Sequence, residues 1–426
     1  MAIDNLTDNI NELLNIKKEC TCGKTHSCDI KNVIVENGAL NKLYKLVEDY
    51  NNILLVADQN TNNACGKEVR ELIGKKIADV LVFESKGYLV PDEKAIDLFK
   101  SKVKETTDLI IGVGSGVIND LCKYVSFINN LPYFIVVTAP SMDGYASTGA
   151  AMIINNMKVT YNAHVPAAII ADVDIIRNAP IDMLKAGYGD ILGKFSCLND
   201  WKLSHIVNNE YFCEYVYNLI YHAVKRTEKL GSKLLQRDSD AVKTLMEALI
   251  IVGIAMSYVG NSRPASGSEH HLSHFFEVIG IMNNEPYFLH GIDVAYSTLV
   301  TQNLREKILE TDISNRTFKF DEAEWEKNIR NIYSKAADGV INLQRKLGWY
   351  EQDKIHVYKE HWDKIKEVLK EAPSSDEIMK LLNSVCLPIE DFENMYGKEK
   401  IDNAIWFAKD LKDRYSVLWL YYHCFR

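Results

Sequence analysis

The first part of the chain alternates short runs of β-branched residues with segments of helical periodicity. Apolar runs typical of buried strands occupy residues 32–35, 53–57, 79–83, 109–112 and 133–137. Helical periodicity covers the segments between them, at about 39–49, through Val69 and Leu72, and at about 93–103 and 117–128. A further β-type segment covers about 153–172. Strands joined by helices pair in parallel through right-handed crossovers, so the pattern predicts a doubly wound parallel sheet.

The character of the sequence changes after Pro180, where strand signals fade and helical periodicity continues to the C-terminus. We therefore expect the α/β fold class, with a nucleotide-binding domain over residues 1–180 and an all-helical metal- and substrate-binding domain over residues 181–426. Clefts between domains commonly hold small molecules, so the site is expected there. At the N-terminus, an amphipathic helix is expected over residues 3–17, where apolar residues recur at helical spacing: Ile3, Leu6, Ile10, Leu13 and Leu14.

Composition narrows the class of protein. The 426 residues are 47% hydrophobic and 25% charged, as in a globular chain. The formal charge of -9 argues against a nucleic-acid or anionic-membrane partner, since both would be repelled. We find neither a run of about 18 apolar residues nor a secretory signal. A cytoplasmic protein without stable membrane insertion is therefore expected.

The nine cysteines do not indicate a disulfide scaffold. Six stand in apolar contexts that favour buried thiols: Cys65, Cys122, Cys197, Cys213, Cys386 and Cys424. The other three cluster with a histidine as Cys20, Cys22, His26 and Cys28, which are potential metal ligands. Structural zinc usually draws two ligand pairs from separated turns, so a hairpin turn with spare thiols is favoured over a metal here.

A glycine-rich loop, Gly112–Asp120, directly follows a predicted strand and opens a helix. Glycines let a backbone approach a pyrophosphate, and the free amides of a helix start receive its charge. The literal G-x-G-x-x-G is absent because residue 117 is Val, so an ordinary strand-to-helix turn is the alternative. Asp58, at the end of an earlier strand, could accept hydrogen bonds from a ribose or could simply form a turn. By pattern alone, Asp143 and Ser147 are turn residues.

Two histidines, His270 and His274, are four residues apart and would share one face of a helix. A divalent metal needs at least one further ligand, for which His290 and Asp190 are the best candidates. Two histidines and a carboxylate with one position left open are typical of a catalytic metal site. The alternative is a solvated or hydrogen-bonded helix face.

Three motifs are the most specific parts of the sequence: Thr138–Ser147, Gly187–Asp190 and Arg263–His270. Together they resemble the sn-glycerol-1-phosphate dehydrogenases, in particular their bacterial branch, within the iron-containing alcohol dehydrogenase and dehydroquinate synthase superfamily. The resemblance covers roughly residues 20–345, and the segment after about 345 matches poorly. It implies NAD(H) or NADP(H), one nickel or zinc ion per chain, a homodimer, and dihydroxyacetone phosphate and glycerol 1-phosphate as substrate and product.

The resemblance also implies residue roles. Asp190, His270 and His290 match the metal ligands, whereas His271 would point about 100° away from His270 on a helix. His274 and Asp143 match substrate contacts. The residues that match the cofactor-binding stretch are Gly116, Val117, Ile118, Asn119, Asp120, Thr138, Ala139, Pro140, Ser141 and Ser147. Relatives often carry another residue at the position of Asn119, which leaves the cofactor preference open.

The implied reaction is hydride reduction of dihydroxyacetone phosphate, with the metal polarising the carbonyl as a Lewis acid. Asp190 and His274 are the expected catalytic residues, and proton delivery is open between His274 and a metal-bound water. Lys194 and Arg263 are nominated for the phosphate because they are basic and near the motifs; a salt bridge is the alternative. Other readings are a dehydroquinate synthase-like lyase, whose carboxylate ligand is typically Glu, a polyol dehydrogenase, and a non-catalytic nucleotide-binding protein.

Overall fold

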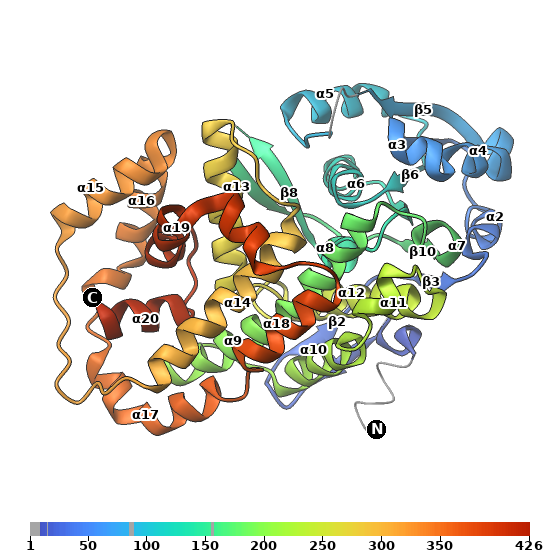
Figure 1. Cartoon of the computed structure of the whole chain (residues 1–426). Coiled ribbons are helices and arrows are strands. Elements are labelled where there is room, and N and C mark those ends of the chain that lie inside the picture. The colour runs from blue at the N-terminus through green and yellow to red at the C-terminus, as the bar shows by residue number, and fades with distance from the viewer. Residues whose placement is uncertain (1–8, 15, 85–88, 155–156) are drawn as a thin grey trace. The chain divides into compact units, whose positions relative to one another are not determined.

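The computed structural model describes residues 9–14, 16–84, 89–154 and 157–426 (Figure 1). The chain divides into two compact units. The first unit comprises residues 1–191 and 218–262, and the second comprises residues 192–217 and 263–426. Most of the helix over residues 214–227 and the two helices that follow it thus belong with the sheet, and the expected domain boundary after Pro180 stays a prediction.

The first unit is built on a six-stranded sheet in the order β3-β10-β7-β6-β4-β5, in which every pairing is parallel. The strands are β3 Asn32–Glu36, β4 Ile53–Asp58, β5 Ile77–Phe83, β6 Leu109–Gly114, β7 Tyr133–Val137 and β10 Ala168–Asp172. Strands β6, β7 and β10 are buried at every position. A strand covered on both faces reads as a continuous apolar run, which is why the sequence located these strands.

Helices cover both faces of this sheet. On one face, Leu43 and Val69 join a hydrophobic cluster with alternate strand residues such as Leu55 and Ile111. On the other face lies Gly112, where an added Cβ would be 2.7 Å from Sγ of Cys122 in the helix over residues 116–128. The helices of the first unit are η2 Ala39–Lys42, α2 Leu43–Leu46, α3 Gln59–Thr61, η3 Asn62–Gly66, α4 Lys67–Ile73, η4 Gly74–Lys76, α5 Glu93–Lys102, α6 Gly116–Ile128, η5 Gly144–Ala146, α7 Val173–Ile176, α8 Ile181–Leu192, α10 Glu214–Thr227, α11 Gly231–Leu235 and α12 Ser239–Val259. The doubly wound architecture is therefore confirmed.

Two antiparallel hairpins lie outside the sheet. The first pairs β1 Lys17–Glu19 with β2 Thr25–Ser27, and the second pairs β8 Gly149–Ile154 with β9 Met157–Asn162. The N-terminal prediction was wrong over its described part, because η1 is a short 3-10 helix, Ile10–Leu13, and the chain is already a strand at Lys17. Ile3 and Leu6 of that prediction lie outside the described residues.

The second unit is helical throughout its described residues, as expected. Its helices are α9 Lys194–Asn208, α13 Ser268–Asn283, α14 His290–Leu309, α15 Glu322–Tyr333, η6 Ser334–Ala336, α16 Ala337–Leu347, η7 Trp349–Glu351, α17 Ile355–Leu369, α18 Ser375–Ser384, α19 Ile389–Phe407, η8 Ala408–Leu411 and α20 Val417–Phe425. Five of the six thiols expected to be buried are buried, but Cys386 is exposed.

One helix is apolar over most of its length, although charged residues interrupt it. α12 is the one helix in the described part of the chain that is long and apolar enough to cross a membrane, with a mean hydropathy of 1.7. However, 78% of the same window is buried inside the protein. The apolar composition of α12 is therefore that of an ordinary core helix, which is buried within the protein.

Candidate functional site

Three of the predicted loops meet at one edge of the sheet. The register pairs Ala57 of β4 with Val113 of β6, and Gly114 of β6 with Val137 of β7, so these parallel strands end side by side. The strand order also reverses between β4 and β6, since β5 follows on one side of β4 and β6 on the other. Ligands of such sheets bind at the carboxyl ends of the strands where the order reverses. The structure thus brings Asp58, the glycine loop and Thr138 to the expected edge.

The glycine loop lets α6 start close to the sheet. A Cβ at Gly114 would lie 2.5 Å from Cβ of Ile118, so a larger residue would push the helix away. No side chain caps the helix at Ser115. The first-turn amides of this 13-residue helix therefore carry the partial positive charge that suits a phosphate group.

Several predicted cofactor residues have structural partners within the first unit. The side chain of Asp58 caps α3 by accepting from the backbone N–H of Thr61 at 2.8 Å, which is the turn-forming alternative. Asn119 is fully buried, and Asp120 accepts from the backbone N–H of Ala151 at 3.2 Å. These contacts hold α6 and its neighbouring loops in place, and the cofactor roles stay predictions.

Sequence reasoning missed Lys123, one turn beyond Asn119 on α6. Its ammonium group is fully buried and donates to the carbonyls of Gly144 at 2.8 Å and Gly149 at 2.7 Å. It also donates to Ser147 Oγ at 3.4 Å. Burial lowers the pKa of Lys123, and the neighbouring Asp120 opposes that effect. Lys123 therefore anchors the loop that carries Ser147; its position on the buried face of a predicted helix was the available signal.

The motifs Thr138–Ser147 and Gly187–Asp190 pack directly on each other within the first unit. A Cβ at Gly187 would lie 1.8 Å from the carbonyl oxygen of Pro140, so only glycine fits. Three residues further along α8, Asp190 Oδ2 accepts from the backbone N–H of Asp143 at 2.9 Å. Asp190 is only 1% exposed. The loop thereby fixes the carboxylate that the sequence singled out.

The second unit brings three histidines together from two helices. His270 and His274 lie near the start of α13, and His290 is the first residue of α14. The ring centroid of His290 lies 5.2 Å from that of His270 and 5.4 Å from that of His274. One ligand nitrogen of His270 lies within 4.8 Å of one from His290. Such a donor set fits a borderline-soft divalent metal.

A buried carboxylate, also missed from the sequence, orients His270. Glu269 Oε1 lies 2.6 Å from His270 Nδ1 and accepts from the backbone N–H of Gly267 at 2.8 Å. Because Oε1 is an acceptor, Nδ1 carries the ring proton and Nε2 keeps its lone pair. Metal-binding histidines are commonly fixed in this way. Burial raises the pKa of Glu269, which is fully buried.

A second group of ligand atoms lies within the second unit. His274, Glu277 and His290 offer atoms that all lie within 4.8 Å of one another. Glu277 was missed, although residues 270, 274 and 277 fall on one face of a helix. By contrast, His271 belongs to neither group. It is fully buried, and burial lowers its pKa well below the usual value.

The two cations nominated for phosphate binding are occupied by protein partners. Lys194 is fully buried and donates to the carbonyl of Ala265 at 2.9 Å. Arg263 is 3% exposed and pairs with Glu210 through Nε at 2.8 Å, while its Nη2 donates to the carbonyls of Asp200 and Tyr415 at 3.0 Å. These contacts show that both cations stabilise the fold around the motifs. Their assignment to a phosphate stays a prediction.

The first unit also has a pocket of about 500 Å³, which is separate from the predicted cofactor loops. Its lining includes Lys31, Pro132 and Ala167, which precede β3, β7 and β10. It is therefore at the amino ends of the parallel strands, opposite the edge where the predicted cofactor loops meet.

Comparison with known proteins agrees with these observations. Residues 34–180 match the iron-containing alcohol dehydrogenase family. A glycerol-1-phosphate dehydrogenase (NAD(P)+) from Halalkalibacterium halodurans is 28% identical over 411 residues, which is 95% of each chain. Another from Geobacillus thermodenitrificans is 30% identical over 331 residues, 76% of this chain and 82% of the relative. The similarity thus extends past residue 345, where the sequence motifs alone had ended it.

A solved structure supports the fold. An archaeal halo-thermophilic alcohol dehydrogenase from a Red Sea brine pool has a TM-score of 0.62 at 13% identity, covering 93% of this chain and 97% of the other. The resemblance inferred from the three motifs is therefore confirmed. The chain belongs to the glycerol-1-phosphate dehydrogenase family of iron-containing alcohol dehydrogenases and is an NAD(P)-dependent enzyme of that family.

Proposed function

We propose that this enzyme reversibly reduces dihydroxyacetone phosphate to sn-glycerol 1-phosphate with NADH or NADPH. The names of its relatives support the substrate and the cofactor. The observation that carries the proposal is the histidine group of the second unit, in which Glu269 fixes the ring of His270. We further propose a cytoplasmic homodimer.

We propose Asp190, His270 and His290 as the ligands of one divalent metal, nickel or zinc. When bound, such an ion acts as a Lewis acid toward the substrate carbonyl oxygen, on which negative charge develops as hydride arrives. Asp190 lies near the end of α8, two residues before the chain enters the second unit at Leu192. Its place in the motif Gly187–Asp190 supports its pairing with the two histidines. The alternative carboxylate is Glu277, which completes a set within the second unit.

Three further groups of the chain would orient the metal ligands and contact the substrate. Glu269 keeps the proton of His270 on Nδ1, so that Nε2 faces the site. The backbone N–H of Asp143 donates to Asp190 and limits rotation of its carboxylate. His274 is half-buried beside both other histidines, and this position supports the proposal that it contacts substrate and hands over a proton.

We propose that the nicotinamide cofactor, which supplies the hydride, binds at the carboxyl edge of β4, β6 and β7. The uncapped start of α6, from Gly116 to Ile118, suits its pyrophosphate. Asp58 has one oxygen committed to the α3 cap, and its other oxygen suits a ribose hydroxyl. Backbone groups of Thr138–Ser141 lie at the same edge, since Thr138 N–H donates to the carbonyl of Gly114.

The test follows oxidation of NADH and of NADPH by the protein with dihydroxyacetone phosphate, dihydroxyacetone or a phosphorylated dehydroquinate-type sugar acid. Glycerol is assayed in the reverse direction, by reduction of NAD+ and of NADP+. Each assay is run after chelation and after re-addition of nickel or zinc. We expect turnover of dihydroxyacetone phosphate alone, lost on chelation and restored by metal. Cyclisation of the sugar acid without net consumption of NADH would instead establish a lyase.

Variants connect this activity to the site. His270→Ala should abolish activity and metal binding at this site together, since it removes a ligand. The control is His356→Ala, an exposed histidine on α17, which should behave as the unmodified enzyme. Full turnover by His270→Ala would refute the assigned site.

A further inference from the structure

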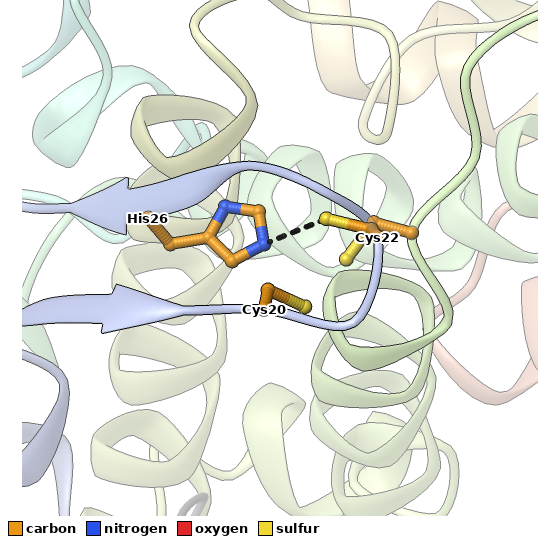
Figure 2. A group of neighbouring side chains, drawn as sticks. Cys20, Cys22 and His26 are labelled. Atoms are coloured by element: carbon orange, nitrogen blue, oxygen red, sulfur yellow. Dashed lines mark hydrogen bonds between the residues drawn. The ribbon is translucent and has the colours of Figure 1, made fainter.

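A separate cluster of cysteine and histidine side chains, which are potential metal ligands, lies on the N-terminal hairpin outside the proposed catalytic site. The turn from Cys20 to Lys24 is closed by two hydrogen bonds, Gly23 N–H to the carbonyl of Cys20 and Cys20 N–H to the carbonyl of Lys24, at 3.0 and 3.1 Å. Gly23 has φ +85°, which favours glycine. The turn brings the side chains of Cys20, Cys22 and His26 together (Figure 2).

The fourth residue of the sequence cluster, Cys28, is not part of this group. It lies beyond the end of β2, and its thiol is buried. Its sulfur is not among the ligand atoms that lie within 4.8 Å of one another in this group.

The tautomer of His26, that is, which ring nitrogen carries the proton, indicates a role as a metal ligand. Its ring is fully buried, stacks on Tyr258 of α12 at 5.5 Å, and places Nδ1 3.0 Å from the carbonyl oxygen of Tyr258. A carbonyl oxygen can only accept, so Nδ1 carries the proton and Nε2 keeps a lone pair. That lone pair faces Cys22 Sγ at 3.5 Å (Figure 2). Carbonyl-bound Nδ1 with an available Nε2 is the usual arrangement of a metal-binding histidine.

The spacing of these atoms matches tetrahedral zinc. With Zn–S of about 2.3 Å and Zn–N of about 2.0–2.1 Å, a tetrahedral ion separates sulfur and nitrogen by about 3.6 Å. The observed separation is 3.5 Å, and the ligand atoms of all three residues lie within 4.8 Å of one another. A thiol-to-imidazole hydrogen bond would also fit the first distance. It would not account for the convergence of Cys20 as well.

We propose that Cys20, Cys22 and His26 hold a structural zinc ion, with Cys213 as its fourth ligand. Cys213 is buried and directly precedes α10, a continuous helix that belongs to the first unit from Asn218 onward. Three thiolates and one imidazole form a closed site without an open position for substrate. The zinc would fasten the hairpin to α12 through His26 and Tyr258, so its effect is on stability and not on the reaction.

The first test uses the full-length protein, reduced, incubated with excess zinc and desalted. Zinc per chain is measured by mass spectrometry, and its ligands by X-ray absorption at the zinc edge. We expect a sulfur shell at about 2.3 Å. The histidine group of the second unit contains no cysteine, so sulfur scattering reports this site whatever metal binds there. Zinc bound without sulfur ligands, or no bound zinc, would overturn the proposal.

A matched pair of variants locates the ion. Cys22→Ser should lose one zinc per chain, the sulfur shell and several degrees of Tm, whereas Cys28→Ser, with its thiol on the same segment, should keep the zinc. Cys213→Ser tests the fourth ligand in the same way. Loss of zinc in Cys28→Ser but not in Cys22→Ser would contradict the assignment.

Thiol protection gives a readout that needs no variant. Cys20 and Cys22 are half-buried, so a maleimide can reach them unless zinc holds their sulfurs. We expect their labelling, located by peptide mass spectrometry, to rise at least tenfold after chelation. Equal labelling of both residues with and without chelator would refute a zinc site here.

Discussion

At the scale of single residues, Glu269 is the most consequential side chain that the motifs did not reveal. Its carboxylate is buried, accepts from Gly267 N–H and from His270 Nδ1, and so sets the tautomer of a proposed metal ligand. An amide oxygen in its place accepts the same bonds without the negative charge that strengthens them.

Glu269→Gln should therefore weaken metal binding by about 10–100-fold with little change of structure. The measurement is calorimetric titration of the chelated protein with zinc or nickel, together with kcat at saturating metal. Loss of the hydrogen-bond partner of a metal-binding histidine weakens metal binding because the imidazole ring loses its fixed orientation. Unchanged affinity would show that Glu269 serves the fold alone.

The choice of carboxylate ligand is a second question at this scale. If Asp190 is the ligand, Asp190→Asn should lose the metal and at least about 10³-fold in kcat/KM, which corresponds to about 4 kcal/mol. Glu277→Gln should retain the metal. The reverse result would assign the ion to His274, Glu277 and His290 and remove Asp190 from the proposed site.

At the scale of elements, two helices of the first unit, α8 and α12, pack closely against the loop over residues 138–147. Gly187 of α8 lies against the carbonyl of Pro140, and Gly253 of α12 would place a Cβ 2.8 Å from the carbonyl oxygen of Asp143. Both contacts are to backbone atoms, which cannot rotate away. The loop that carries the predicted cofactor and substrate residues is thus held between two helices.

Gly187→Ala should destabilise the protein by about 2–3 kcal/mol, because α8 and the loop must separate to admit the methyl group. Gly339→Ala is the matched control: Gly339 is exposed inside α16, has nothing within 4 Å of an added Cβ, and its φ is not positive. It should stabilise by about 0.5–1 kcal/mol. Urea unfolding followed by circular dichroism measures both. Equal stability of the two variants would contradict the packing argument.

At the scale of the whole molecule, buried neutral histidines link stability to pH. Burial lowers the pKa of His423 in α20 to about 4, and it also lowers the pKa of His271 well below its usual value. Unfolded histidine titrates near 6.5. Between those values the unfolded chain binds protons that the folded chain does not, so the free energy of unfolding falls as pH falls through this window. Above about pH 6.5 both histidines are neutral in the folded and the unfolded chain, so neither makes the free energy of unfolding depend on pH.

We expect His423 alone to lower the free energy of unfolding by at most about 3 kcal/mol between pH 6.5 and pH 4. His423→Asn keeps a donor toward the carbonyl of Trp419 but cannot be protonated. Its stability should therefore depend less steeply on pH in this window, as measured by denaturant unfolding at half-unit steps. Parallel curves for the two proteins would show that His423 is already protonated when folded.

Much of the architecture was predictable, since the buried parallel strands read as continuous apolar runs and the glycine loop stands between a strand and a helix. What the sequence did not reveal has physical causes. Arg263 and Lys194 were nominated because of their charge, but only tertiary contacts with Glu210 and the carbonyl of Ala265 show what those charges do. The apolar α12 escaped notice because isolated polar residues interrupt a segment that is nevertheless mostly buried.

The sequence by itself determined the doubly wound sheet, the helical second part, the family and the spacing of His270 and His274, because strand burial, helical periodicity and local motifs are written in neighbouring residues. Only the tertiary structure decided which distant groups meet: Glu269 with His270, Asp190 with the backbone of Asp143, Gly187 with Pro140 and His26 with the carbonyl of Tyr258. The physical reason is that tautomer, burial and close approach depend on where the chain packs, which residue spacing alone does not specify.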